Sequence, residues 1–501
     1  MHRLRIFALL LIAICAKPIN AQPSMGINLA GPCDWNTELP FVDVFRQSRP
    51  WISQRPGQPW GGGPALELNE LGWVTRLEPG CFAETLMLTD LDGHYPKGRY
   101  TVLYEGAGRV EITRGRIVER APGRIVFEVH PTAGISLQLH EIDPADPVRN
   151  IRVIMPGFED TYLNNPWHPR FLERWQDFAA VRFMDFMHTN NSTITRWEQR
   201  PTPQHQTFSQ RGVAVEYLVD FANRADLDPW FCMPHEADDE FIRQFARYVK
   251  RHLNPDRRVY VEWSNETWNS IFQQHRYAAV KGQQLGLANQ PWAAAWQYTA
   301  RRSVEVFRLW EQEFGEGPRL VRVLATQSAN PYIAEQMLAF PPVAQHADAL
   351  AIAPYLGLHL TAERVDDVLA LGVDGLLDQL EEDVLPQVTS QHIRRHKAVA
   401  DKFGLQLIAY EAGQHLVGVG AAVNQQPLTD LLQQVNAHPR MATIYRQYFD
   451  AWQQEGGGLL AHFSSISAWS KWGSWGLMQY YDQDPQTQPK MHATFQQARR
   501  W

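Results

Sequence analysis

Eight short apolar segments, separated by stretches that fit amphipathic helices, are the feature that most constrains the fold. The segments are residues 25–30, 180–184, 229–233, 258–263, 320–325, 349–353, 405–410 and 459–463. Between the third and the fourth, Asp238 can cap a helix in which Phe241, Phe245 and Val249 recur on one face. Alternating strands and helices predict a parallel sheet, and eight repeats predict an α/β fold of the (β/α)8 TIM barrel type. A doubly wound open sheet is the alternative, but no glycine-rich phosphate loop follows the first strand.

A different pattern interrupts this rhythm after the first strand. Short runs at residues 100–104, 109–113, 125–129 and 135–139, several of them alternating, are separated by Gly, Pro and Asp. This is typical of antiparallel strands. We therefore expect a small antiparallel β insertion at residues 74–157, with the barrel formed by residues 22–73 and 158–501. Its role, as a binding module or as structural decoration, stays open.

Residues 1–21 have the features of a secretory signal peptide. Arg3 and Arg5 precede an apolar stretch at residues 6–16, and residues 19–21 fit a cleavage site. The apolar stretch is short for a membrane span, so no integral membrane segment is expected after signal removal. Cys15 raises the alternative of a lipoprotein, which Ile14 before it disfavours. The sequence thus predicts a secreted or periplasmic protein.

Composition excludes one class of partner and leaves the thiols open. The chain has 501 residues, of which 44% are hydrophobic, and its formal charge is -7. A negative chain is not expected to bind a phosphate backbone, so no nucleic-acid partner is predicted. Cys33 and Cys81 either pair in an oxidising compartment or stay as thiols, and Cys232 lies in an apolar run that predicts a buried thiol. Nothing in the sequence indicates the oligomeric state.

Two glutamates stand directly after two of the predicted strands. Glu266 follows Asn265 at the end of the fourth strand, and Glu411 follows the seventh. In a TIM barrel the loops at the C-terminal ends of the strands form the active site, so these carboxyls can face each other across its mouth. Cleavage of a glycosidic bond requires such a pair, because one carboxyl donates a proton to the leaving oxygen while the other attacks or activates water.

On these residues the chain resembles the retaining glycoside hydrolases of clan A, over most of its length outside the insertion. The resemblance indicates no family within the clan. It implies that Glu266 is the acid/base and Glu411 the nucleophile, with the carboxyls about 5 to 5.5 Å apart, and that Asn265 holds the sugar 2-hydroxyl. The implied partner is a poly- or oligosaccharide, and no cofactor is required.

Four further residues are candidates for binding substrate or supporting the nucleophile. Arg182 near the second strand and Tyr355 near the sixth are placed to contact Glu411, as their counterparts in the clan commonly do. His235 ends the third strand and can bind a sugar hydroxyl, and Trp469 after the eighth can offer an aromatic platform. A structural salt bridge for Arg182 and a hydrogen-bonded loop position for His235 are the competing interpretations.

Other classes of function have weaker support. His235 and Glu236 with Asp238 and Asp239 form the one local cluster of metal-ligating residue types, but its spacing matches no zinc motif, so no metal is predicted. No Gly-x-Ser-x-Gly elbow indicates a serine hydrolase. A carbohydrate-binding protein without turnover, built on a barrel scaffold, remains the alternative, although the presence of both carboxylates argues against it.

Overall fold

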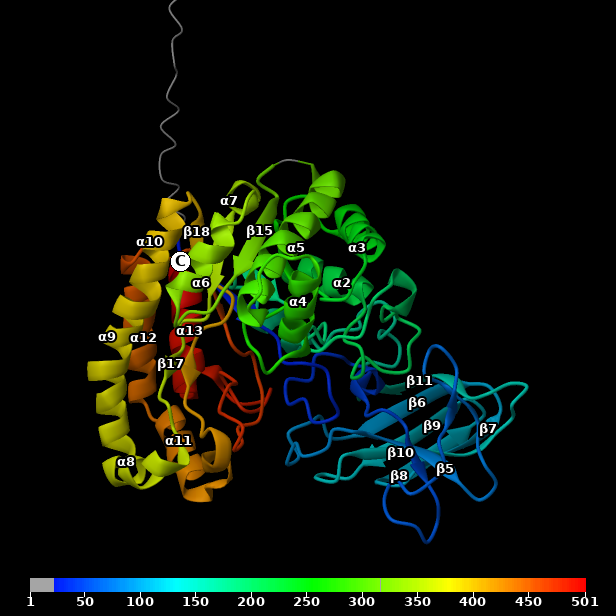
Figure 1. The fold of residues 1–501 in the computed structure, drawn as a ribbon. Coiled ribbons are helices and arrows are strands. Elements are labelled where there is room, and N and C mark those ends of the chain that lie inside the picture. Colours follow the sequence, from blue (N-terminus) through cyan, green and yellow to red (C-terminus); the bar gives the residue numbers. More distant parts are fainter. Residues whose placement is uncertain (1–21, 316) are drawn as a thin grey trace, which may run out of the picture.

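The computed structural model describes residues 22–315 and 317–501, and its centre is a closed barrel of eight parallel strands. Figure 1 shows the barrel surrounded by helices, with a β-rich unit beside it. The barrel strands, in order, are β1 (Ser24–Asn28), β12 (Ala180–Arg182), β13 (Asp228–Met233), β14 (Val259–Trp263), β15 (Leu320–Ala325), β16 (Ala349–Ile352), β18 (Gln406–Ala409) and β20 (Leu459–His462). The predicted (β/α)8 fold is confirmed, and the fourth and seventh strands are β14 and β18.

Helices connect the strands and cover the outside of the barrel. They are α1 (Pro169–Arg174), α2 (Val215–Ala225), α3 (Asp239–His252), α4 (Gln273–Gln284), α5 (Pro291–Phe314), α6 (Pro331–Ala339), α7 (Val343–His346), α8 (Val365–Gln379), α9 (Leu385–Gln387), α10 (Arg394–Lys402), α11 (Gln426–Ala437), α12 (Arg440–Gln454) and α13 (Pro489–Arg500). The carboxylate of Asp238 accepts a hydrogen bond from the backbone N–H of Phe241 at 2.7 Å and so caps α3, as predicted.

Alternation along the strands decides which side chains point into the barrel. In β13, Phe231 belongs to the core between strands and helices, whereas Trp230 and Cys232 belong to a separate cluster inside the barrel. Successive side chains of a strand point to opposite faces. The same alternation turns Arg182 of β12 and Glu262 of β14 inward, so two charged residues lie in the barrel interior.

The β-rich unit is a sandwich of two four-stranded antiparallel sheets, in the orders β2-β5-β10-β7 and β11-β6-β9-β8. The strands are β2 (Ile52–Gln54), β5 (Phe82–Met87), β6 (Arg99–Glu105), β7 (Gly108–Ile112), β8 (Gly115–Ala121), β9 (Arg124–Val129), β10 (Ile135–Ile142) and β11 (Arg149–Ile154). Two short pairs, β3 (Glu67–Leu68) with β4 (Val74–Arg76) and β17 (Leu356–Gly357) with β19 (Gln414–His415), complete the sheets.

The antiparallel insertion is therefore present, but its sheets begin earlier than expected. β2 pairs with β5, so they start at Ile52 rather than at residue 74. β2 has only three residues and is followed by a Gly- and Pro-rich stretch at residues 56–64, which hides the strand from pattern analysis.

The sandwich occupies the first loop at the C-terminal face of the barrel, because the chain leaves β1 to form it and returns to α1. The loop after β20 also contacts it. The ring of Tyr481 belongs to the sandwich core, and the hydroxyl of Tyr480 donates to Asp92 at 3.0 Å. The loops that follow the first and the last strand thus meet at the sandwich, on the face where TIM barrels carry their active sites.

Asp43 joins the barrel loop to the sandwich. Its Oδ1 accepts hydrogen bonds from the backbone N–H groups of Phe45 at 3.2 Å and Val153 at 2.9 Å. Its Oδ2 lies 3.5 Å from Nε of Arg46 and 3.4 Å from Nε of Arg152. Burial raises the pKa of Asp43, and the two guanidinium groups oppose that rise. One buried carboxylate therefore balances two cations at this joint.

Three further predictions concern the signal peptide, membrane spans and the cysteines. The proposed signal peptide at residues 1–21, with Cys15, lies outside the described residues. In the part of the chain that is described, no helix combines the length and the apolar character that crossing a membrane requires. Cys33, Cys81 and Cys232 are all free thiols, and Cys232 is buried as predicted.

Replacing Asp43 by Asn tests the joint. The amide keeps the shape of the side chain and an oxygen for Phe45 and Val153, but Arg46 and Arg152 lose their counter-charge. We expect the free energy of unfolding to fall by about 3 kcal/mol, measured by urea denaturation. Asp374→Asn, at an exposed position of α8, is the matched control. Equal stability of Asp43→Asn and wild type would contradict the role given to the ion pairs.

Candidate active site

The loop after β14 holds Glu266 in an unusual backbone conformation. Ser264 and Glu266 have positive φ angles of 63° and 41°, a region that residues other than glycine rarely adopt. The amide of Gln274 donates to the carbonyl oxygen of Asn265 at 2.9 Å, and the N–H of Asn269 donates to that of Glu266 at 2.8 Å. These bonds hold the strained turn, which directs the Glu266 side chain toward Tyr410.

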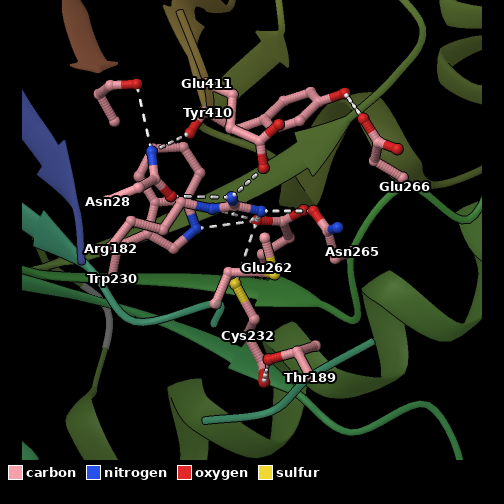
Figure 2. Close-up of polar contacts among 12 residues, drawn as sticks. Asn28, Arg182, Thr189, Trp230, Cys232, Glu262, Asn265, Glu266, Tyr410 and Glu411 are labelled. Carbon is pink, nitrogen blue, oxygen red and sulfur yellow. Dashed lines mark hydrogen bonds and ion pairs between the residues drawn. The ribbon is translucent and has the colours of Figure 1, made fainter. Parts of the chain in front are cut away.

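Glu411 lies two residues after the end of β18 and is buried. Nη1 of Arg182 donates to its Oε1 at 3.0 Å, and the hydroxyl of Tyr355 donates to its Oε2 at 2.9 Å (Figure 2 shows the Arg182 contact). Burial raises the pKa of Tyr355 well above its usual value, so its hydroxyl stays protonated and remains a donor. One cation and one neutral donor thus face Glu411, and the predicted contacts of Arg182 and Tyr355 are present.

Glu266 is partly exposed and has two neutral donors. The hydroxyl of Tyr410 donates to its Oε1 at 3.1 Å, and the amide of Asn269 donates to its Oε2 at 3.0 Å. Tyr410 directly precedes Glu411 in the chain, and its ring extends from the Glu411 side of the site to Glu266 (Figure 2). The two carboxyls therefore lie at the same end of the barrel with Tyr410 between them.

Arg182 is the centre of the polar network. Besides Glu411, its guanidinium donates to Glu262 Oε2 from Nε at 3.2 Å and from Nη2 at 2.9 Å. It also donates to Asn28 Oδ1 at 3.1 Å and to Asn265 Oδ1 at 2.8 Å. A guanidinium has five N–H donors, and here each has an acceptor. Arg182 is consequently fixed in one orientation.

The two carboxyls at the mouth influence each other's ionisation. Burial, and next the charge of Glu266, raise the pKa of Glu411 to about 8. Burial also raises the pKa of Glu266, against the hydrogen bonds from Asn269 and Tyr410. The titrations of two such groups belong to the pair, so the pair keeps one proton at neutral pH. Because the cation Arg182 contacts Glu411, the arrangement favours the charge on Glu411 and the proton on Glu266.

Two of the predicted substrate-binding residues make other contacts. His235 is buried, its ring packs edge-on against Tyr277 at 5.3 Å, and burial lowers its pKa to about 4. Trp469 donates from its indole N–H to the carbonyl of Gly476 at 3.0 Å, and its ring lies 4.6 Å from Nζ of Lys490. Neither residue is joined by these contacts to Glu411 or Glu266.

Trp475, in the same loop as Trp469, contacts a residue that holds Glu411. Its ring packs edge-on against Tyr355 at 5.9 Å, His415 at 5.1 Å and Phe463 at 5.7 Å. Tyr355 in turn donates to Glu411, so Trp475 is the tryptophan of this loop that borders the carboxyl site. Three Trp residues within seven positions look alike in the sequence, and only the packing of the loop distinguishes them.

The sequence interpretation missed Tyr410, Asn28 and Glu262. Each belongs to a strand or directly follows one, and each lies within a segment whose apolar pattern predicts only a strand. Counting every second residue inward from Ile408 would have turned Tyr410 into the barrel. Asn28 pairs in register with Arg182 of the neighbouring strand, and its amide also donates to the carbonyl of Tyr410 at 2.9 Å.

The described residues offer no candidate metal centre. Within residues 22–315 and 317–501, no group of three or more His, Cys, Asp or Glu side chains could hold a metal ion. Asp238, from the cluster considered in the sequence, is occupied as the cap of α3.

No protein family model and no curated protein matches the sequence. Solved structures to which the chain is similar include a 4-O-α-L-rhamnosyl-β-D-glucuronidase from Fusarium oxysporum, with 8% identity, 68% of this chain and 66% of that chain covered, and a TM-score of 0.41. The chain is also similar to fungal β-1,4-galactanases, with 13% identity, 66% of this chain and 92% of that chain covered, and a TM-score of 0.32. A third similar structure is a xyloglucan-specific endo-β-1,4-glucanase from a metagenomic library, with 12% identity, 68% of this chain and 91% of that chain covered, and a TM-score of 0.36. The alignment takes in slightly less than two thirds of the glucuronidase. The names of these structures describe a glucuronidase, galactanases and a glucanase, and the identities of 8 to 13% with TM-scores of 0.32 to 0.41 assign neither a family nor an activity to this chain.

The raised pKa, which belongs to Glu411 and Glu266 as a pair sharing one proton, predicts a pH dependence of stability that requires no substrate. A carboxyl with a raised pKa binds its proton more tightly in the folded chain, so its stabilisation is complete below the usual value of 4.5 and is lost as pH rises through about 8. Glu411→Gln removes one carboxyl of the pair and with it the repulsion that helps to raise the pKa. We expect the difference in Tm, wild type minus variant, to fall by on the order of a few °C between pH 4.5 and 9. Scanning calorimetry measures it, with Glu173→Gln on the exposed face of α1 as control; a difference that is constant or rises with pH contradicts the assignment.

Proposed function

We propose that the protein is a retaining glycosidase that cleaves O-glycosidic bonds of a poly- or oligosaccharide. The observation that carries this proposal is a pair of carboxyls at the ends of β14 and β18 with unlike partners, a cation at Glu411 and neutral donors at Glu266. Such a pair supplies both a nucleophile and a proton donor. Export, predicted from residues 1–21, would bring the enzyme to glycans outside the cytoplasm.

In the first step Glu411 attacks the anomeric carbon. Its carboxylate oxygen forms a covalent bond to the sugar, the bond to the leaving oxygen breaks, and Glu266 gives its proton to that oxygen. Arg182 and Tyr355 hold Glu411 for the attack through one oxygen each. The products of this step are a glycosyl ester on Glu411, an ionised Glu266 and the departed sugar.

In the second step water releases the sugar. Glu266, now ionised, takes a proton from the water as its oxygen attacks the anomeric carbon, and the ester bond to Glu411 breaks. Two displacements at one carbon restore its original configuration. Both carboxyls return to their starting protonation states, and no cofactor enters either step.

Asn265 is suited to hold the sugar while this occurs. Its Oδ1 is engaged by Arg182, and its Nδ2 donates to Asn190 Oδ1 at 3.0 Å. One N–H of the amide is left for an acceptor such as the 2-hydroxyl of the sugar, a contact that strengthens in the transition state. His235 and Trp469 make contacts elsewhere, which gives them less support as ligands.

Separate replacements of the two carboxyls test their roles. After a screen over plant, algal and bacterial polysaccharides identifies a substrate, we expect Glu411→Ala to lose at least about 10³-fold in kcat on every leaving group. Glu266→Ala should lose about 10²- to 10⁴-fold on the glycan but retain a fast first step on a dinitrophenyl glycoside, whose leaving oxygen needs no proton. Burst kinetics measures the first step, and proton NMR of the first product measures retention.

The outcomes separate the proposal from its alternative. Glu173→Gln should equal the wild type in every assay. An inverted first product would exclude the double displacement. Glycan binding without turnover in both the wild type and Glu411→Ala would instead favour the carbohydrate-binding protein.

Trp475 and Trp469 form a matched pair for the aromatic platform. Because Trp475 packs on Tyr355 and Trp469 packs on Lys490, we expect Trp475→Ala to raise KM or lower kcat by at least about tenfold, while Trp469→Ala changes kcat/KM less than about threefold. Steady-state kinetics on the identified glycan measures both. The reverse ranking would restore Trp469 as the platform.

A further inference from the structure

We propose that Glu262 is a positioning residue that acts on the nucleophile through Arg182, by fixing the guanidinium and taking part of its charge. This inference rests on the proposed function of Glu411. Glu262 itself does not reach the carboxyls at the mouth through any hydrogen bond among the described residues. The contact that links it to Glu411 is the guanidinium of Arg182, which both carboxyls share.

The geometry joins Glu262 to Arg182 inside the barrel. The Arg182 side chain is fully buried, and that of Glu262 is 2% exposed. Glu262 Oε2 accepts from Nε and Nη2 of Arg182, from the indole N–H of Trp230 at 3.0 Å and from the thiol of Cys232 at 3.5 Å (Figure 2). One oxygen with four donors is well suited to carry a negative charge.

The orientation of Arg182 follows from this contact. Nε and one N–H of Nη2 are directed at Glu262, and Asn265 takes the other N–H of Nη2. Only Nη1 is left on the side of Glu411, and it also donates to Asn28. Glu411 therefore receives a single N–H from the guanidinium, where an unshared arginine would give a carboxylate two parallel bonds.

The positive charge of Arg182, like its N–H donors, is shared between Glu262 and Glu411. One cation lies between two buried carboxylates, so neither is fully neutralised. Glu262 thus leaves Glu411 more basic than it would be beside an unshared guanidinium, and a more basic carboxylate is a stronger nucleophile. Glu262 opposes ionisation of Glu411, while Arg182 favours it.

Other ionisable groups also face this network. Glu266 and Asp185 oppose ionisation of Glu411, and the Tyr355 hydroxyl favours it. Burial raises the pKa of the Cys232 thiol and of Tyr410 well above their usual values, so both stay neutral. The charge of Glu262 also helps to raise the pKa of Cys232, Tyr410 and Glu266, so its replacement favours ionisation at Glu266 as well as at Glu411.

Glu262→Gln is a conservative test. In the described residues Glu262 Oε1 has no hydrogen-bond partner, so the amide nitrogen can take its place while the amide oxygen keeps the contacts of Oε2. The charge is lost and the shape is kept. We expect the acid limb of the kcat/KM profile to move down by about one pH unit and kcat to fall about tenfold.

A second readout does not depend on turnover. With ¹³C-labelled glutamate, the carboxyl resonance of Glu411, assigned by its loss in Glu411→Gln, should titrate about one pH unit lower in Glu262→Gln than in wild type. The control is Glu84→Gln, which removes a buried carboxylate from the sandwich and should leave both the titration and the pH profile unchanged.

The two readouts separate the inference from the proposed function. If no glycan is cleaved by the wild type, the proposed function fails, and the resonance shift still decides whether Glu262 acts on Glu411. If the wild type is active but Glu262→Gln moves neither the acid limb nor the resonance, the inference is wrong, even if the variant is less stable.

Glu262→Asp serves if Glu262→Gln does not fold. It keeps the charge but draws the carboxylate back by one methylene, so kcat should fall about tenfold from misalignment of Arg182 while the acid limb stays within about 0.3 pH unit of wild type. A downward shift as large as that expected for Glu262→Gln, or wild-type kcat, would overturn the inference.

Discussion

The guanidinium of Arg182 is the interaction on which the site depends. A buried cation is tolerated only where acceptors replace its lost hydration, and Arg182 finds them on β1, on β14 and in the loops after β14 and β18. Rings pack on it as well, with Trp230 at 5.3 Å and Tyr410 at 5.1 Å. The contacts that stabilise the charge also fix the positions of Asn265 and Glu411 relative to each other. The same contacts of Arg182 therefore stabilise the barrel interior and determine the geometry at its mouth.

The sandwich affects the same face from outside. It fills the first loop, and Asp43 binds that loop to β11 through Val153, while Tyr481 inserts from the last loop. The loop after β20 also carries Trp475, which packs on Tyr355. Packing of the insertion thus restrains the loop that borders the carboxyl site. This connection gives the insertion a structural role at the mouth whether or not it also binds glycan.

The sequence predicted what depends on local pattern and strand count. Eight apolar segments were enough to place Glu266 and Glu411 at strand ends. The strand count, together with the resemblance to clan A, predicted that Arg182 and Tyr355 contact Glu411. It did not predict that Trp475 rather than Trp469 would border Tyr355, because that depends on how one long loop folds back. The role of Glu262 was not predicted because β14 is buried on both faces, so the sequence pattern of this strand does not show which residues point inward. β2 was not predicted because a three-residue strand is recognised only by its pairing, and its partner β5 lies about thirty residues further along the chain.

The total charge of the buried network stays constant through the proposed catalytic cycle. With Glu266 protonated, the ionised Glu262 and Glu411 exceed Arg182 by one negative charge. In the proposed cycle, esterification removes the charge of Glu411 at the moment when Glu266 gives up its proton, so the buried cluster keeps the same total charge. The repulsion that held the proton on Glu266 disappears with the charge on Glu411, because that repulsion acts between the two carboxyls. Glu266 then no longer faces an ionised Glu411 and can act as the base. Arg182, still paired with Glu262, does not need a new partner while Glu411 is esterified, and it remains in place to stabilise the carboxylate when the ester breaks.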